Sequence, residues 1–235
     1  MKLIVMIPTY NEADNIVPLL ENILVQPFDL EVVVVDDDSR DGTAAAVRSV
    51  AARDGRVHLL LRPGPRGRGL AGREGFVWAL RNGADYVVEM DGDGSHDPAE
   101  LGRFLEAVRS ADLVVGSRFV PGGKAEGRGW FRNTVSNLAR TYLRLVIGVP
   151  VADPTSGYRL FRREALRKIR PETLTAPDPF IVAEVLYRGH KAGLRIKEIP
   201  IIFKDRRLGE SKLSLTILFT YLLRALKLRF RGEKF

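Results

Sequence analysis

The chain has 235 residues, 45% of them hydrophobic, 28% charged and none cysteine, which is typical of a globular protein and excludes disulfides and thiolate metal sites. No uncharged apolar stretch approaches the roughly 20 residues that cross a bilayer, and the apolar run after Met1 is too short for a signal peptide. Residues 1–117 carry 12 Lys and Arg against 19 Asp and Glu, a net charge of −7, whereas residues 118–235 carry 25 against 10, a net charge of +15. A basic surface for phosphate is therefore expected in the second half. A nucleic-acid partner is not expected, because the acidic first half would repel it.

Apolar runs alternate with helical periodicity along the first half. Strands are predicted at residues 2–7, 31–36, 57–62, 86–90 and 112–118. Helices are predicted around residues 16–24, 42–52, 72–82 and 97–108, and residues 62–69 form a loop rich in Gly, Pro and Arg. Asp97, Pro98 and Glu100 supply an N-cap, a first-turn proline and a capping box for the fourth helix. This alternation predicts an α/β fold with a mostly parallel sheet flanked by helices.

The second half begins with a glycine-rich basic loop at residues 120–129. An amphipathic helix follows at 130–146, then a short strand at 158–161, a helix at 179–190 and an edge strand at 194–204 that contains Pro200. The last predicted helix, residues 213–231, places Arg224, Lys227 and Arg231 on one side and leucines and phenylalanines on the other. Such a helix is expected to lie in a membrane interface, and the alternative is a helix that packs on the core or on a second copy.

Two aspartates close the fourth predicted strand. Asp91 and Asp93 are separated by one residue, so in an extended chain their side chains project to the same face. Ligands of open α/β sheets bind at the carboxyl edge of the strands, and two carboxylates there repel unless a cation lies between them. A divalent ion such as Mg²⁺ or Mn²⁺ that also binds a substrate phosphate is therefore predicted, against the alternative of a solvated turn.

Two further strand ends carry similar groups. Asp36, Asp37 and Asp38 follow the second strand, and the segment PTYNE, residues 8–12, follows the first. The alternatives are local: Asp41 as the N-cap of the next helix, and a capping box between Thr9 and Glu12. Three polar strand ends on one rim favour a nucleotide site, in which Tyr10 offers a ring face and Glu12 a carboxylate.

In chain order, PTYNE, VVDDDSRDGT, GRGLAGREGF, VEMDGDGSHDP, VGSRFVPGG, DPTSGYRLFRR and DRRLGESKL resemble the polyprenyl-phosphate (dolichyl-phosphate) mannose synthases, among family 2 glycosyltransferases of GT-A fold. The resemblance covers about residues 2–213. It implies a Rossmann-like GT-A domain at residues 1–212, with a nucleotide- and metal-binding half at 1–117, an acceptor-binding half at 118–212, and a membrane-associating tail at 213–235.

The resemblance also implies roles for individual residues. The donor nucleotide would be bound by Pro8, Tyr10, Glu12, Asp36, Asp37, Arg68, Gly69, Ala71, Asp91 and Gly92. The metal would be bound by Asp91 and Asp93, with Ser95 as a further ligand. The acceptor phosphate would be bound by Arg118, Arg132, Ser136, Arg206, Ser211 and Lys212, of which Arg118, Arg206 and Lys212 would also take part in catalysis with the two aspartates. Asp153 and Arg159 would lie near the sugar or serve as scaffold.

The implied reaction moves mannose from GDP-mannose to a polyprenyl or dolichyl phosphate with inversion, giving a β-mannosyl phosphate. A phosphate monoester is already anionic near pH 7, so no His or Glu base is required, and His96 has the alternative reading of a capping or packing residue. The implied partners are the nucleotide sugar, the lipid phosphate, the cytoplasmic face of a membrane and small membrane-anchoring subunits. UDP-glucose or another donor is the first alternative, and a non-catalytic nucleotide-binding partner protein is the second.

Some positions depart from the family pattern. Gly67-Arg68-Gly69 stands where Gly-Leu-Gly is frequent, and Gly92 stands where the family often has Ala. Many members also continue into transmembrane helices and this chain does not, so a soluble or peripheral protein is expected.

Overall fold

The computed structural model describes residues 1–126, 130–204 and 215–230, and for residues 130–136, 139 and 215–220 it describes the backbone alone. Seven strands form one sheet in the order β3-β2-β1-β4-β7-β5-β8. Their bounds are β1 Leu3–Thr9, β2 Leu30–Asp36, β3 Val57–Leu61, β4 Tyr86–Glu89, β5 Leu113–Ser117, β7 Arg159–Arg162 and β8 Ile196–Pro200. Only β7 runs antiparallel to its neighbours β4 and β5, which confirms the mostly parallel α/β sheet.

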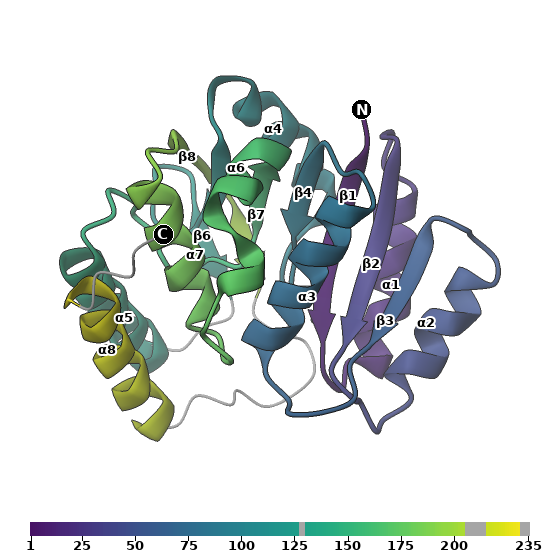
Figure 1. The fold of residues 1–235 in the computed structure, drawn as a ribbon, viewed down its shortest axis with the longest axis horizontal. Helices are drawn as coiled ribbons and strands as arrows, with labels where there is room; N and C mark the ends of the chain where they lie inside the picture. The colour runs from purple at the N-terminus through teal and green to yellow at the C-terminus, as the bar shows by residue number, and fades with distance from the viewer. Residues whose placement is uncertain (127–129, 205–214, 231–235) are drawn as a thin grey trace.

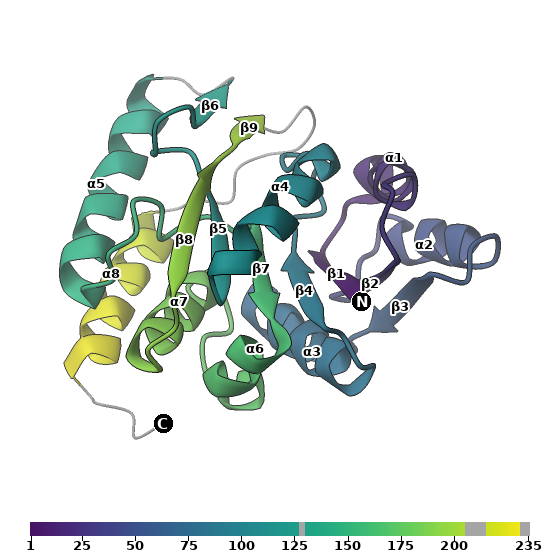
Figure 2. The ribbon, with the colours of Figure 1, turned by 90° about the horizontal axis from the view of Figure 1, so that it is seen from above.

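Helices cover both faces of the sheet, as Figures 1 and 2 show. One face packs against α1 Ala13–Leu24, α2 Thr43–Ala51 and α4 Leu101–Ala107. The other packs against α3 Arg68–Arg81, α6 Arg163–Ile169 and α7 Ile181–Lys191. Strands β1, β2 and β4 are buried on both faces, which explains why the sequence shows continuous apolar runs there rather than alternation.

Two further helices extend the second face beyond the edge strand β8. These are α5 Trp130–Ile147 and α8 Leu215–Phe230, which lie side by side in both views. Leu143 and Ile147 of α5 and Ala225 and Leu228 of α8 are buried in the same core cluster. The final helix therefore packs on the domain rather than standing apart from it. Within the described part of the chain, no helix combines the length and apolarity needed to cross a bilayer.

The structure corrects several predicted boundaries. The predicted loop at 62–69 ends earlier, because α3 begins at Arg68, where the Gly69 amide donates to the Pro177 carbonyl at 3.0 Å. The predicted edge strand at 194–204 is two strands: β8 borders the main sheet, and β9 Ile202–Lys204 leaves it to pair with β6 Lys124–Glu126. Strand β6 lies inside the segment predicted as a loop at 120–129. Helix α6 was not predicted.

Candidate active site

The carboxyl ends of β1 and β2 meet in register, Thr9 opposite Asp36. Asp36 is buried and accepts from the Ser39 amide at 3.1 Å and from the Ser39 hydroxyl at 2.6 Å. Thr9 Oγ1 lies 3.4 Å from the same carboxylate. Asp36 thus closes the turn after β2, and its contact with a ligand stays a prediction.

Asp37 is paired within the protein as well. Its carboxylate accepts from the Arg62 guanidinium and from the Gly67 amide, and the Arg62 and Asp37 side chains are 6% and 5% exposed. The pKa of the Asp37 carboxyl is raised, because the effect of burial exceeds those of the Gly67 amide and the Arg62 charge, which lower it. Because Gly67 immediately precedes α3, this carboxylate fixes the start of the loop expected to lie against the nucleotide.

The PTYNE segment is joined to the loop after β2. The Glu12 amide donates to Thr43 Oγ1 at 2.9 Å, and the Ala13 amide donates to the Asp41 carboxylate at 2.9 Å. Asp41 also accepts from the Thr43 amide at 3.0 Å, so it caps the start of α2, although Gly42 occupies the N-cap position. The capping box between Thr9 and Glu12 does not form, because Glu12 itself is the N-cap of α1 and its side chain accepts from Asn15 instead.

The ring of Tyr10 lies beside an ion pair. The guanidinium of Arg66 lies 4.8 Å from the centre of that ring and pairs with Asp38 at 2.9 Å. Asp38 itself has a positive φ of 59° in the tight turn after β2. An aromatic face beside a cation suits a nucleobase, and Arg66, which the sequence analysis did not select, lies beside Tyr10 of the predicted base site.

Asp91 and Asp93 follow β4 at the same edge of the sheet. The Asp93 side chain is buried and its Oδ1 accepts from the Ser95 amide at 3.1 Å, whereas the Asp91 side chain is 30% exposed and accepts from Arg68 at 2.7 Å. Gly92 is explained by packing, since a Cβ there would lie 2.8 Å from Thr9 Cγ2. Gly94 has a φ of +73°, which favours glycine in the turn that follows.

His96 holds this turn in place. Its Nδ1 accepts from the Asp91 amide at 3.1 Å, so the neutral ring carries its proton on Nε2. The ring stacks on Tyr158 with centroids 4.8 Å apart. The pKa of the imidazole is lowered, because the effect of burial exceeds that of the Asp91 and Asp93 charges, which raise it. These contacts, with Nε2 lying 3.9 Å from the Asp91 carboxylate, support the packing role of His96.

Behind the two aspartates lies a buried cluster of charges. Glu89 is 0% exposed and accepts from Arg159 Nε at 2.9 Å and from Arg68 Nη1 at 3.1 Å. Arg159 Nη1 donates to the Val182 carbonyl at 2.9 Å. Arg68 therefore bridges Glu89 and Asp91, and a glutamate that the sequence analysis did not select is central to the cluster. An acidic residue inside the apolar run at 86–90 was the signal for it.

The donor set fits a hard divalent cation. It consists of the Asp91 and Asp93 carboxylates with Ser95 Oγ nearby in sequence, a buried hydroxyl without a hydrogen-bond partner within the described residues. No group of three His, Cys, Asp or Glu capable of holding a metal occurs in the part of the chain that the structure describes. The site thus resembles magnesium and manganese sites that take their remaining ligands from water and substrate phosphates.

The predicted acceptor residues are distributed unevenly. Arg118, directly after β5, is buried and forks onto Asp153 through two bonds of 2.8 Å, and it also donates to Thr155 at 2.6 Å. Arg132 and Ser136 lie on the first part of α5, at positions for which only the backbone is described. Arg206, Ser211 and Lys212 lie outside the described residues. A bidentate bond to an acceptor phosphate requires Arg118 to share or leave Asp153, so its role there stays a prediction.

The pairing of Asp153 predicts a pH-dependent stability. Burial raises the pKa of Asp153, but the hydrogen bonds and charge of Arg118 outweigh it and leave that pKa below the usual 3.8. The stabilisation is therefore present above about pH 4 and is lost as the pH falls through the lowered folded-state pKa. Asp153→Asn is expected to cost about 2 kcal/mol of unfolding free energy at pH 7 and less at pH 3. Urea titrations of both proteins at the two pH values measure this, and an equal cost at both would contradict it.

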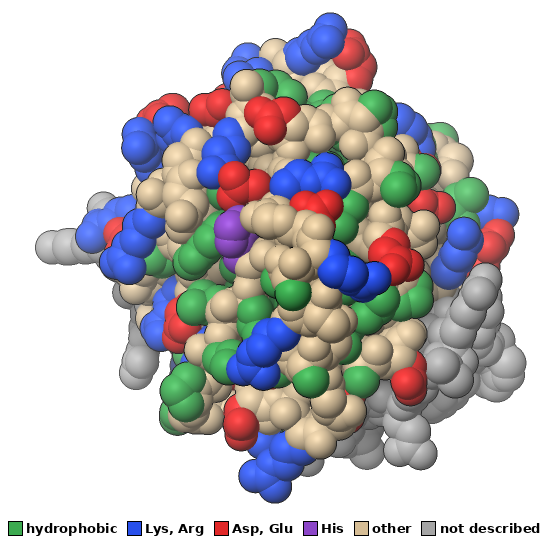
Figure 3. Space-filling view, turned by 90° about the vertical axis from the view of Figure 1, so that its right-hand side faces the viewer, with side chains coloured by type: hydrophobic (Ala, Val, Ile, Leu, Met, Phe, Trp, Pro, Cys, Tyr) green, Lys and Arg blue, Asp and Glu red, His purple; other side chains and the backbone are tan. Residues whose placement is uncertain are grey.

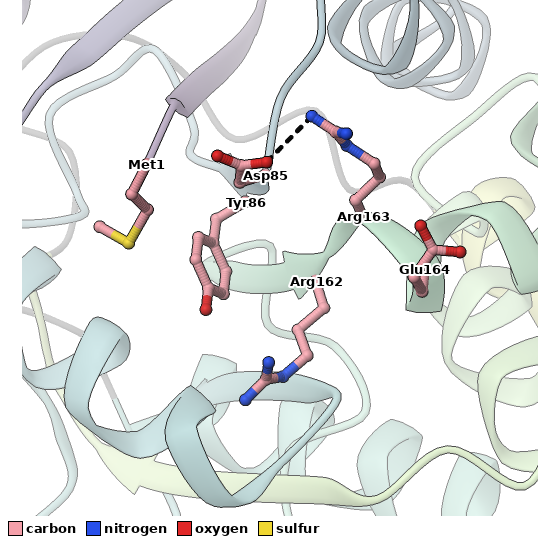
Figure 4. A pocket seen from close by; sticks show the side chains of 6 residues that line it. All are labelled: Met1, Asp85, Tyr86, Arg162, Arg163 and Glu164. Carbon is pink, nitrogen blue, oxygen red and sulfur yellow. Dashed lines mark ion pairs between the residues drawn. The ribbon is translucent and has the colours of Figure 1, made fainter.

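A surface pocket lies at the opposite edge of the sheet, beside the amino ends of β1 and β4. Met1, Asp85, Tyr86, Arg162, Arg163 and Glu164 line it (Figure 4). Arg163 pairs with Asp85 at 3.0 Å, and Arg162 donates to the Ala111 carbonyl at 2.8 Å. Its cations are used within the fold, so the edge that carries Asp91 is the candidate active site. The face beside β3 and α2 intersperses acidic and basic side chains among the residues described (Figure 3).

Residues 4–170 match the family Glycosyl transferase family 2. A polyprenol monophosphomannose synthase of Mycolicibacterium smegmatis is 42% identical over 213 residues, covering 90% of this chain and 80% of that protein. An undecaprenyl-phosphate mannosyltransferase of Micrococcus luteus is 42% identical over 214 residues, covering 91% and 88%. Among solved structures, glucosyl-3-phosphoglycerate synthase from Mycobacterium tuberculosis, in complex with Mn²⁺, UDP and glucosyl-3-phosphoglycerate, superposes with a TM-score of 0.69 at 20% identity, covering 97% of this chain and 78% of that one. This likeness supports the GT-A fold.

Proposed function

This chain belongs to glycosyl transferase family 2, and from that premise we propose that it transfers mannose from GDP-mannose to a polyprenyl phosphate, with inversion at the anomeric carbon. The observation that carries the proposal is the identity of 42% to two polyprenyl-phosphate mannosyltransferases over nine tenths of the chain. The paired carboxylates at the end of β4, beside the proposed base site at the ends of β1 and β2, support a nucleotide donor.

In the proposed reaction an oxygen of the acceptor phosphate attacks the anomeric carbon of mannose. The bond from that carbon to the donor diphosphate breaks, and its electron pair leaves with GDP. The acceptor is anionic at pH 7, so no side chain has to remove a proton, in keeping with the buried packing role of His96. The task of the protein is to hold two anions close together and to stabilise the charge that grows on the leaving group.

The residues divide that task between them. Asp91 and Asp93 would hold Mg²⁺ or Mn²⁺ against the donor diphosphate, and the metal supplies charge stabilisation for the leaving group. Tyr10 and Arg66 would bind the base, while Asp37 positions the loop at Gly67 through its amide. We propose that the donor and acceptor phosphates are bound by Arg206, Ser211 and Lys212. Arg132 and Ser136 of α5 are proposed to bind the phosphates with them.

A transfer assay tests the proposal. Labelled GDP-mannose, UDP-glucose and UDP-GlcNAc are supplied separately with a polyprenyl phosphate, with Mg²⁺ or with EDTA. Metal-dependent movement of label into the organic phase with GDP-mannose alone is expected. Transfer with another donor would keep the reaction and correct the sugar, whereas no transfer with any donor would favour a non-catalytic partner protein.

We also propose that the protein binds the cytoplasmic face of a membrane through α5 and α8. Leu138 and Leu145 of α5 and Leu223, Leu226 and Phe230 of α8 are exposed, Leu145 and Phe230 to 79% each. Lys227 and Arg144 are exposed among them, whereas Arg224 faces the protein and pairs with Asp178 at 2.7 Å. Apolar side chains flanked by cations suit an anionic lipid surface.

Point substitutions test this membrane contact better than removal of α8, since Ala225 and Leu228 belong to the core. Phe230→Glu and Leu145→Glu are each expected to lower liposome binding by at least about tenfold, because each loses roughly 1.5–3 kcal/mol of apolar burial. The measurement is flotation with anionic vesicles. Val25→Glu, at a side chain 75% exposed elsewhere, is the matched control. Equal binding by all variants would contradict the proposed surface.

A further inference from the structure

We propose that Arg68 is a built-in counter-cation of the metal site. Its guanidinium binds Asp91 in the metal-free protein and opposes entry of the divalent ion until a nucleotide diphosphate arrives with it. Arg68 is thus a positioning residue that makes tight metal binding depend on the donor. This inference rests on the proposed function, because it assumes that Asp91 and Asp93 bind the metal.

The contacts of Arg68 are specific at both ends of its guanidinium. Nη1 donates to Glu89 Oε1 at 3.1 Å and Nη2 donates to Asp91 Oδ1 at 2.7 Å. Gly157 completes the seat of the guanidinium, since a Cβ at that position would lie 2.8 Å from Arg68 Nη2 and 3.1 Å from Asp91 Oδ1. The chain therefore packs closely against the pair at Gly157, while the Arg68 and Asp91 side chains remain 22% and 30% exposed.

Backbone contacts fix the position of Arg68 at the start of α3. A Cβ on Gly67 or Gly69 would lie 2.1 or 2.0 Å from the carbonyl oxygens of Pro177 and Ala176, so the first turn of α3 lies directly against residues 176–178. The Gly69 amide donates to the Pro177 carbonyl at 3.0 Å. That carbonyl therefore anchors the turn, and the Arg68 side chain points from a fixed origin toward the carboxylates of β4.

The charges of the cluster explain why Arg68 opposes entry of the metal. Glu89, Asp91 and Asp93 carry three negative charges, and the positive charges of Arg68 and Arg159 neutralise two of them. The net charge of the cluster is therefore −1 when a divalent ion approaches. Two cations a few ångströms apart in a partly buried site repel by several kcal/mol. A nucleotide diphosphate adds negative charge and oxygen acceptors for the guanidinium, so it relieves that repulsion for Arg68 and the metal together.

The test is a titration with Mn²⁺, followed by the electron paramagnetic resonance of the free ion, without nucleotide and then with GDP. Arg68→Leu removes the charge, and Arg68→Gln keeps a hydrogen-bonding side chain in case the leucine destabilises the fold. Without nucleotide, both variants are expected to bind Mn²⁺ about tenfold more tightly than the wild type. GDP is expected to tighten Mn²⁺ binding more in the wild type than in either variant.

Arg163→Gln is the matched control, because it removes the same charge from an ion pair with Asp85 at the opposite edge of the sheet. Its Mn²⁺ affinity is expected to stay within about twofold of the wild type, and thermal melting shows whether each variant is folded. Unchanged or weaker Mn²⁺ binding by both Arg68 variants, with binding intact in the wild type, would overturn this inference and leave the proposed function standing. Absence of Mn²⁺ binding by every protein, with GDP present, would overturn both.

Discussion

Asp93→Asn is expected to lower the rate of sugar transfer by at least about a thousandfold, which corresponds to roughly 4 kcal/mol of lost transition-state stabilisation. The substitution keeps the size of the side chain and one oxygen to accept from the Ser95 amide, so the turn after β4 is expected to survive. It removes the buried carboxylate that the proposal assigns to the metal, and the charge that develops on the departing diphosphate then loses its main counter-charge. The same reasoning applies to Asp91, where Arg68 already neutralises part of the carboxylate.

Initial rates with GDP-mannose and saturating Mg²⁺ measure the effect. Asp54→Asn is the matched control, because Asp54 pairs with Arg56 on the surface and its loss should leave the rate within about twofold. Equal melting temperatures would separate a catalytic defect from unfolding. A residual rate above a tenth of the wild type for folded Asp93→Asn would show that the metal, if bound, is held by other groups.

The strands and the meeting of their polar carboxyl ends at one rim were predictable, because both depend on local patterns. Apolar runs such as 31–36 predict buried strands wherever the rest of the chain lies, and parallel strands bring their carboxyl ends to one edge. Asp91, Asp36 and the PTYNE segment could therefore be assigned to one rim without knowledge of any contact. The antiparallel β7 between β4 and β5 was not predictable, since a short strand carries no mark of its direction.

The partners of the acidic residues could not be predicted, because they come from loops distant in sequence. Asp36 and Asp37 were both expected to face the nucleotide, yet Ser39, Arg62 and Gly67 satisfy much of their hydrogen-bonding capacity. Arg118 was expected to hold phosphate, and the structure pairs it with Asp153, 35 positions further along the chain. Such pairs arise where the fold brings loops together, and a count of charges along the sequence does not reveal them.

The last helix shows the same limit in another form. Its amphipathic pattern predicted an interfacial helix, with packing on the core as the alternative. The structure shows the packing, since Ala225 and Leu228 are buried against the domain. Leu226 and Phe230 are exposed, and their contact with a membrane stays a prediction. Periodicity identifies an apolar face but does not say how wide a sector the protein covers. That sector depends on α5, with Tyr142 donating to the Leu222 carbonyl at 3.0 Å.

Arg159→Met is expected to lower the free energy of unfolding by about 3–5 kcal/mol, the cost of leaving a buried carboxylate without its main partner. Glu89 is 0% exposed and Arg159 is 1% exposed, so water cannot replace the lost bonds, and the Val182 carbonyl loses a donor as well. Unfolding by urea at pH 7 measures the effect in the full chain.

A double-mutant cycle with Glu89→Gln separates the ion pair from the packing of the arginine. With the glutamate neutral, loss of Arg159 should cost at least about 2 kcal/mol less than it does beside Glu89, because no uncompensated charge remains. Costs that add within about 0.5 kcal/mol would contradict the pairing as the source of stability. The cycle also bears on the metal site, since Arg68 reaches Glu89 and Asp91 together. If Glu89 is held by Arg159, then one end of the Arg68 guanidinium is fixed by the core of the protein, and only its bond to Asp91 has to break when a metal enters.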